Sequence, residues 1–149
     1  KITQRGDVRM KMFETLRDYD DILMLELSDH NYQIFQAAMD ISVFALCPRG
    51  YGKTSFRIHE ALHYGAIPVY IYDEPWIPFG DMINFELYGV LCHINDIDSL
   101  HQRLEKIVSD GHVERILRAG RFAYEQYYTY SACYDRIIQK LRISNEIFA

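Results

Sequence analysis

The 149-residue sequence predicts an α/β domain with a Rossmann-like parallel sheet flanked by helices and a helical C-terminal end. Short apolar runs of strand length alternate with segments whose apolar residues recur every three or four positions. The run "AIPVYIY" at 66–72 shows no polar alternation, which is typical of a strand covered on both faces. From Asp96 onward the pattern is helical.

Each expected element has its own local signal. The expected strands are "DILMLEL" at 21–27, "SVFALCP" at 42–48, "AIPVYIY" at 66–72 and "GVLCHI" at 89–94. The expected helices are 7–19, 31–40, 55–64, 96–110, 113–128 and 131–143. Asp29 or Asn31 is expected to cap the second helix, and Gly65 to end the third. Pro48 ends a strand because it has no N–H to donate.

The composition predicts one domain over residues 1–149 and excludes several function classes. A net charge of −5 argues against a general nucleic-acid surface. No apolar run approaches the ~20 residues that cross a bilayer and no signal peptide opens the chain, so we expect no membrane contact by this segment. Cys47, Cys92 and Cys133 are too widely spaced to indicate a disulfide framework or a zinc knuckle.

One stretch, "GYGKTSFRIHEALHYGAIPVYIYDE" at 50–74, fits three chemistries. Gly52-Lys53-Thr54 resembles the end of a phosphate-binding P-loop. That motif requires its first glycine at the position of Cys47, which Pro48 follows. Cys and Pro oppose the curl that turns backbone N–H groups toward phosphates, so we do not expect an NTPase.

The zinc interpretation of "HEALH" is more complete. His59 and His63 would share one face of a helix, with Glu60 as the base of a zinc hydrolase. The extended form of the motif needs a glycine and a third histidine at positions where the chain has Ala66 and Val69. We therefore expect no metal, and zinc hydrolysis stays the third-ranked hypothesis.

The third interpretation is a nucleotide-sugar site. Ser55 is expected to open a helix directly after the glycine-rich loop, where loop amides and the helix amino end attract a diphosphate. Arg49 and Arg57 could add charge-assisted hydrogen bonds, and Glu60 could accept both hydroxyls of a ribose. A plain Arg57–Glu60 ion pair on the helix surface explains the same spacing equally well.

Residues 44–84 resemble the signature of the exostosin-type glycosyltransferases, which runs F-x-L-x-P-R-G, then S-F-R-x-x-E-A-L-x-x-G-x-I-P-V, then P-F and an I-N segment. The matching positions are Phe44, Leu46, Pro48, Arg49, Gly50, Ser55, Phe56, Arg57, Glu60, Ala61, Leu62, Gly65, Ile67, Pro68, Val69, Pro78, Phe79, Ile83 and Asn84. Phe85 replaces a frequent Trp of the family, and Tyr51 occupies a loop position that is basic in some relatives.

The resemblance implies the C-terminal, donor-binding lobe of a GT-B fold, with inverting, metal-independent transfer from a nucleotide sugar to a glycan acceptor. We expect a UDP-sugar as donor and no cofactor. The nucleotide-sugar-binding residues that it implies are Arg49, Gly50, Tyr51, Ser55, Arg57 and Glu60. We expect the N-terminal acceptor domain to be absent from this chain, and no catalytic residue is identified.

A non-catalytic nucleotide-binding or interaction domain that kept the fold is the alternative from another class. Activity of the parent polypeptide with an acceptor separates the two. If the parent follows the eukaryotic family, the resemblance implies the Golgi lumen, with any membrane anchor outside this chain.

Overall fold

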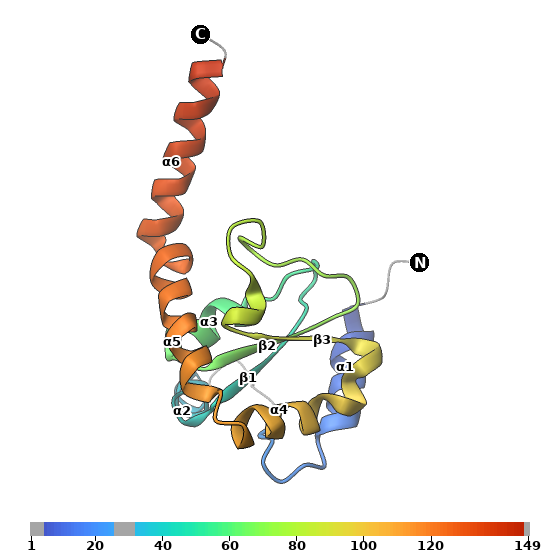
Figure 1. Ribbon diagram of the computed structural model, residues 1–149. Helices are drawn as coiled ribbons and strands as arrows, with labels where there is room; N and C mark the ends of the chain where they lie inside the picture. Colours follow the sequence, from blue (N-terminus) through green and yellow to red (C-terminus); the bar gives the residue numbers. More distant parts are fainter. Residues whose placement is uncertain (1–4, 26–31, 148–149) are drawn as a thin grey trace.

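The computed structural model describes residues 5–25 and 32–147, which form a parallel sheet with helices on both faces (Figure 1). The strands are β1 (Phe44–Pro48), β2 (Ile67–Tyr72) and β3 (Val90–His93). The helices are α1 (Arg5–Leu16), α2 (Tyr32–Ile41), α3 (Arg57–Tyr64), α4 (Leu100–Ser109), α5 (Val113–Ala123) and α6 (Tyr130–Ile147). The 3-10 helices are η1 (Phe85–Leu87) and η2 (Ile94–Ser99), and η3 (Tyr124–Tyr128) is a π-helical turn.

The sheet has the order β1-β2-β3, with both pairs parallel. Val69 of the central strand β2 pairs with Leu46 on one side and with Val90 on the other. Ile67, Val69 and Ile71 belong to one core cluster, whereas Tyr70 belongs to the other. The alternation places successive β2 side chains on opposite faces, so the expectation of a strand covered on both faces is confirmed.

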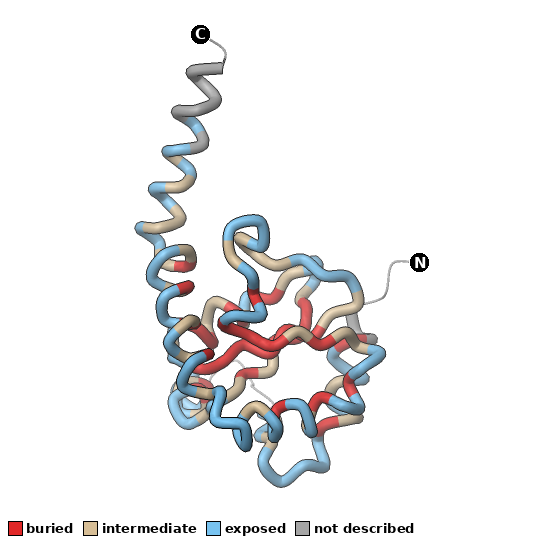
Figure 2. The backbone as a smooth tube through the Cα atoms, viewed as in Figure 1, coloured by how far each residue is buried: buried red, intermediate tan, exposed pale blue. Residues whose placement is uncertain are grey.

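Two groups of helices cover these faces. Buried residues of α2, α3 and η3 contribute to the cluster that contains Tyr70. Buried residues of α1 and α4 contribute to the other cluster, with Ile116 of α5. Figure 2 shows the buried strands at the centre of the domain and exposed residues around the rim. Figure 1 shows α6 projecting away from this body. Among the described helices, none combines the length and apolar character that crossing a bilayer requires.

Most predicted elements are confirmed within two residues, and several details differ. The prediction of a strand at 21–27 is wrong for residues 21–25, the part that the structure describes. Ile22 and Met24 instead pack against the core cluster that includes residues of α1. The predicted caps Asp29 and Asn31 lie outside the described residues. The helix predicted at 113–128 changes into the π-helical turn at Tyr124.

Gly65 ends α3 as the sequence predicts. Its φ of 77° is left-handed, and its N–H closes the helix onto the carbonyls of Ala61 and Leu62. Side chains disfavour this conformation because Cβ approaches the following carbonyl oxygen. Glycine therefore lets the chain turn directly from α3 into β2.

We expect Gly65→Ala to lower the free energy of unfolding by about 1 kcal/mol, through backbone strain alone. A Cβ at Gly65 meets no atom within 4 Å, so no steric clash contributes. Gly52→Ala is the matched control, because a Cβ there also meets nothing within 4 Å and Gly52 has no positive φ. Equal losses at the two positions in urea denaturation would contradict the strain argument.

Candidate functional site

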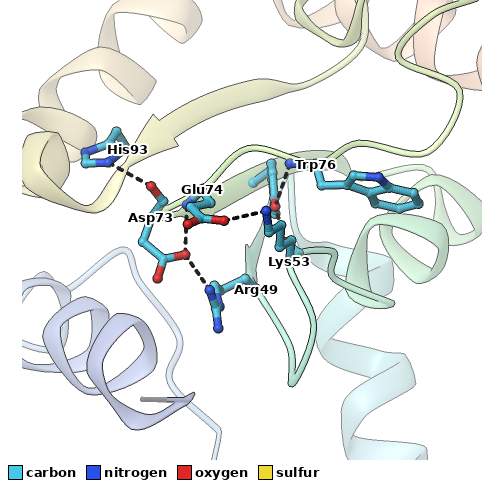
Figure 3. A network of polar contacts seen from close by, with 7 residues as sticks. Arg49, Lys53, Asp73, Glu74, Trp76 and His93 are labelled. Carbon is cyan, nitrogen blue, oxygen red and sulfur yellow. Dashed lines mark hydrogen bonds and ion pairs between the residues drawn. The ribbon is translucent and has the colours of Figure 1, made fainter. Parts of the chain in front are cut away.

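Polar and charged side chains gather where the three parallel strands end. Arg49 follows β1, Asp73 follows β2, and His93 is the last residue of β3. Figure 3 shows these three side chains with those of the adjoining loops in one polar network. Ligands of open α/β sheets bind beyond this edge. The edge is therefore the first place to look for a binding site.

Arg49 and Asp73 form a buried ion pair at this edge. The Arg49 Nη1 atom donates to Asp73 Oδ1 at 2.7 Å, and each side chain is only 10% exposed. The backbone N–H of Arg49 also donates to the Ile71 carbonyl at 2.9 Å. Asp73 Oδ1 accepts the Glu74 N–H at 2.8 Å as well. Arg49 thus fixes the end of β1 to the end of β2 through both its backbone and its side chain.

His93 connects β3 to the same loop. Its Nδ1 accepts the Asn95 N–H at 3.2 Å, which leaves the proton on Nε2. Nε2 then donates to the Asp73 carbonyl at 3.1 Å. Asp73, which directly follows β2, therefore connects all three strand ends. Its carboxylate binds Arg49 after β1, and its backbone carbonyl binds His93 of β3.

The glycine loop, residues 49–54, has a fixed backbone. The Gly50 N–H donates to the Thr54 carbonyl at 2.7 Å. A Cβ at Gly50 would lie 3.3 Å from that same oxygen, so the close approach favours glycine. The hydroxyl of buried Tyr70 donates to the Lys53 carbonyl and accepts the Trp76 N–H at 3.4 Å. Tyr70 therefore joins the glycine loop to the loop after β2.

A second contact between the two loops is exposed. Lys53 Nζ lies 2.5 Å from Glu74 Oε2, with side chains 57% and 60% exposed (Figure 3). Exposed ion pairs contribute little net stability, because water solvates the separated charges nearly as well. Lys53 is thus held weakly at the loop surface, and an anion could replace Glu74 as its partner.

Arg57 and Glu60 lie together in the first part of α3. Arg57 Nε is 3.2 Å from Glu60 Oε2, so the simple helix ion pair considered for this spacing is present. The Arg57 guanidinium also lies 4.3 Å from the centre of the Phe35 ring, which packs α3 against α2. Both charged side chains keep more than a third of their surface exposed.

The charges of Arg57 and Glu60 reach the end of β1. Burial raises the pKa of the Cys47 thiol well above its usual range; Arg57 opposes this rise in the pKa, and Glu60 adds to it. Cys47 lies two residues before Arg49. Because α3 begins at Arg57, three residues after the glycine loop, and packs against β1, its ion pair and that loop lie in the same corner of the domain.

A polar rim extends from Glu60 toward α2. The Tyr64 hydroxyl lies 3.2 Å from the Tyr32 hydroxyl and accepts a hydrogen bond from Gln36 Nε2 at 3.0 Å. The hydrogen bond with Tyr64 raises the pKa of Tyr32, and the charge of Glu60 adds to that pKa shift. Tyr64 follows Glu60 by four residues on α3, so these hydroxyl and amide groups lie one turn further along the same helix face.

The remaining sequence-predicted residues differ in accessibility. Tyr51 is exposed at the tip of the glycine loop, whereas Ser55 is buried below it. Ser55 does not open α3, which begins at Arg57; its carbonyl accepts the Ile58 N–H at 3.2 Å in a preceding turn. The structure brings Arg57 and Glu60 together and places Arg49 with Asp73.

The two histidines of "HEALH" have other partners. His59 Nε2 lies 2.9 Å from the Tyr128 carbonyl, and His63 Nδ1 lies 2.8 Å from the Tyr124 hydroxyl. Both histidines therefore attach α3 to η3. Within residues 5–25 and 32–147, no group of three or more histidine, cysteine, aspartate or glutamate side chains is arranged to hold a metal ion.

Sequence reasoning missed several residues of this network, among them Tyr70, Asp73, Glu74 and His93. Asp73 and Glu74 follow a predicted buried strand, which was the available signal for acids at the sheet edge. In the sequence pattern Tyr70 looks like any other apolar residue of the predicted strand, and no neighbouring residue indicates that its hydroxyl contacts Lys53. These contacts depend on the register of the sheet.

Residues 1–107 match the exostosin GT47 domain family. The chain belongs to this family. A "Probable glucuronosyltransferase" of Oryza sativa subsp. japonica is 34% identical over 98 residues, covering 66% of this chain and 22% of that protein. A "Probable beta-1,4-xylosyltransferase" of Arabidopsis thaliana is also 34% identical over 98 residues, covering 66% of this chain and 23% of that protein.

A "Probable glucuronosyltransferase" of Physcomitrium patens is 30% identical over 104 residues, or 70% of this chain and 22% of its own length. The exostosin GT47 relatives thus carry glycosyltransferase names, and the chain spans about a fifth of their length. The family match ends at residue 107, so α5, η3 and α6 lie beyond it.

We expect Arg49→Met to lower the free energy of unfolding by about 3–5 kcal/mol, because it leaves the Asp73 carboxylate buried without its cation. The double variant Arg49→Met/Asp73→Leu should recover much of this loss, since neither charge then remains. Arg121→Met is the control: its pair with Glu125 is exposed, and we expect a loss below about 1 kcal/mol. Similar urea midpoints for Arg49→Met and Arg121→Met would contradict a structural role for the buried pair.

Proposed function

We propose that this chain is the donor-binding lobe of an inverting, metal-independent glycosyltransferase of GT-B architecture. It takes a UDP-sugar as donor for transfer to a glycan acceptor. The observation that carries the proposal is the Arg57–Glu60 pair beside the glycine loop, at the carboxyl edge of a parallel sheet, in an exostosin GT47 domain. Family membership supports the transfer reaction, and the edge supports the location of the donor.

The diphosphate would lie against the glycine loop and the amino end of α3. Backbone N–H groups at a helix amino end attract anions. Lys53 could exchange its exposed contact with Glu74 for a phosphate oxygen, and Arg57 could offer its planar fork. Arg49, already bound to Asp73, holds the loop in place beneath the diphosphate.

The nucleoside would occupy the space beside Glu60. The two carboxylate oxygens of Glu60 can accept hydrogen bonds from both ribose hydroxyls, in place of their contact with Arg57. Gly50 lets the loop backbone come close to the donor, and buried Ser55 supports the turn into α3. Exposed Tyr51 offers an aromatic ring at the loop tip for the nucleotide.

The other half of the reaction belongs to the acceptor-binding domain of the parent polypeptide. We expect the catalytic base there, because general base catalysis requires contact with the acceptor hydroxyl. This chain would then bind a donor without turning it over. UDP binding by the isolated chain, and transfer by the parent protein, are accordingly the two tests.

We expect Glu60→Gln to weaken UDP binding about tenfold or more in calorimetry, because an amide replaces the charge that strengthens both ribose contacts. Asp110→Asn is the matched control. Asp110 lies 3.3 Å from Lys106 and is 40% exposed, against 3.2 Å and 41% for Glu60. It is at the end of α4, away from the sheet edge, and should leave UDP affinity unchanged.

The loss must come from the ribose contacts. A 2′,3′-dideoxy UDP analogue should bind wild type and Glu60→Gln almost equally weakly, because the same hydrogen bonds are missing in both cases. If Glu60→Gln binds UDP as tightly as wild type, Glu60 is only the partner of Arg57 and its assignment to the ribose fails.

We expect UDP affinity to be the same in excess EDTA as in added Mg²⁺ or Zn²⁺, since the proposed site neutralises the diphosphate with backbone amides and cationic side chains. Elemental analysis should find no stoichiometric zinc in the purified chain. About one zinc per chain, lost in His63→Ala, would contradict the proposal and favour the zinc hydrolase.

A further inference from the structure

The loop between β2 and β3, residues 73–84, contains a strained residue. Phe79 has a φ of 60°, the only positive value among the described residues that are not glycine. A bulky side chain in this conformation costs free energy and persists only where its surroundings hold it. This segment, here called the proline loop, also carries Trp76 and Pro78.

The ring of Phe79 is held by residues far along the chain. It packs edge-on against Tyr128, with ring centres 5.3 Å apart, and against Tyr127 at 5.8 Å. The guanidinium of Arg136 lies 4.3 Å from the centre of the Tyr127 ring and 5.8 Å from that of Phe79. Residues of the π-helical turn η3 and of the first part of α6 thus contact the strained residue from one side.

Polar contacts fix the loop backbone beside that ring. The Tyr128 hydroxyl donates to the Pro78 carbonyl at 3.2 Å and lies 3.0 Å from the Tyr88 hydroxyl. Arg136 donates from Nη1 to Met82 Sδ at 3.0 Å and from Nη2 to the Gln126 carbonyl at 3.1 Å. Arg136 therefore links the proline loop to η3 through two directed bonds and a stacked ring.

The other end of the proline loop is attached to the candidate site. The Trp76 N–H donates to the Tyr70 hydroxyl, which in turn donates to the Lys53 carbonyl of the glycine loop. In Figure 3 the Trp76 backbone lies beside Lys53, and the indole ring points away from the ion pairs. A shift of the Phe79 turn would therefore move the Trp76 backbone and, through the Tyr70 hydroxyl, disturb the glycine loop.

We propose that Arg136 and Tyr128 are positioning residues of the donor site: they hold the strained Phe79 turn and thereby keep the proline loop against the glycine loop. The inference rests on the proposed function. Both residues lie beyond the segment that matches the family. The inference therefore gives the C-terminal helices a role in donor binding.

The test uses Trp76, the only tryptophan of the chain, as its reporter. Arg136→Lys keeps the charge but loses the planar fork and the stacking surface. We expect acrylamide to quench Trp76 fluorescence more strongly in this variant, and the dissociation constant for UDP to rise about fivefold or more. Tyr128→Phe, which keeps the ring and loses the bond to Pro78, should change both readouts in the same direction.

Arg121→Lys is the control, because Arg121 also lies close to η3 along the chain but is exposed and, among the described residues, pairs with Glu125. It should match wild type in quenching and in UDP affinity. Unchanged Trp76 quenching in Arg136→Lys, with or without lower stability, would overturn the positioning role. Increased quenching with unchanged UDP affinity would overturn it too, because the loop would then move without consequence for the donor.

Failure of the proposed function gives a different result. If wild type does not bind UDP in calorimetry, the donor assignment fails, and so does the role of Arg136 and Tyr128 in donor binding. Increased quenching in Arg136→Lys would then still show that Arg136 holds the loop, so the two failures are distinguishable.

Discussion

Arg49 and Asp73 meet at 2.7 Å where β1 and β2 end, and both side chains are almost fully enclosed. A charge in such surroundings is stable only beside its partner, so the loops that carry the two residues cannot separate cheaply. The same loops contain Lys53, Glu74 and Trp76 of the candidate site. Its layout therefore depends on one buried contact, with Tyr70 and His93 attaching the neighbouring segments to it.

Local patterns were sufficient to predict most of the fold. The unbroken apolar run of β2 indicated burial on both faces, and Gly65 indicated the end of α3, because both signals follow from short-range chemistry. The prediction of a strand at 21–27 failed because apolar residues also occur in loops that pack against a core, as Ile22 and Met24 do. The π-helical turn η3 could not be foreseen, because its geometry goes with tertiary contacts to His59 and Pro78.

The candidate site was predictable in part. Motif spacing placed Arg57 and Glu60 on one helix, and the structure pairs them on α3, which packs against β1. The role expected of Arg49 stays a prediction, and its buried contact with Asp73 adds a structural function that spacing cannot reveal. Asp73, Tyr70 and Arg136 come from three separate segments. Only the folded chain shows that they support the same pair of loops.

Hydrogen–deuterium exchange of the chain with and without UDP tests the central claim, that the donor lies at the carboxyl edge of the sheet, against the glycine loop and the amino end of α3. We expect UDP to protect residues 49–54, the first turn of α3 and residues 73–84, and to leave α4 unchanged. A hollow of about 530 Å³ at the opposite end of the sheet, lined by Gly65, Ile67 and Gly120 among others, is the competing location. Protection confined to that hollow would contradict the account.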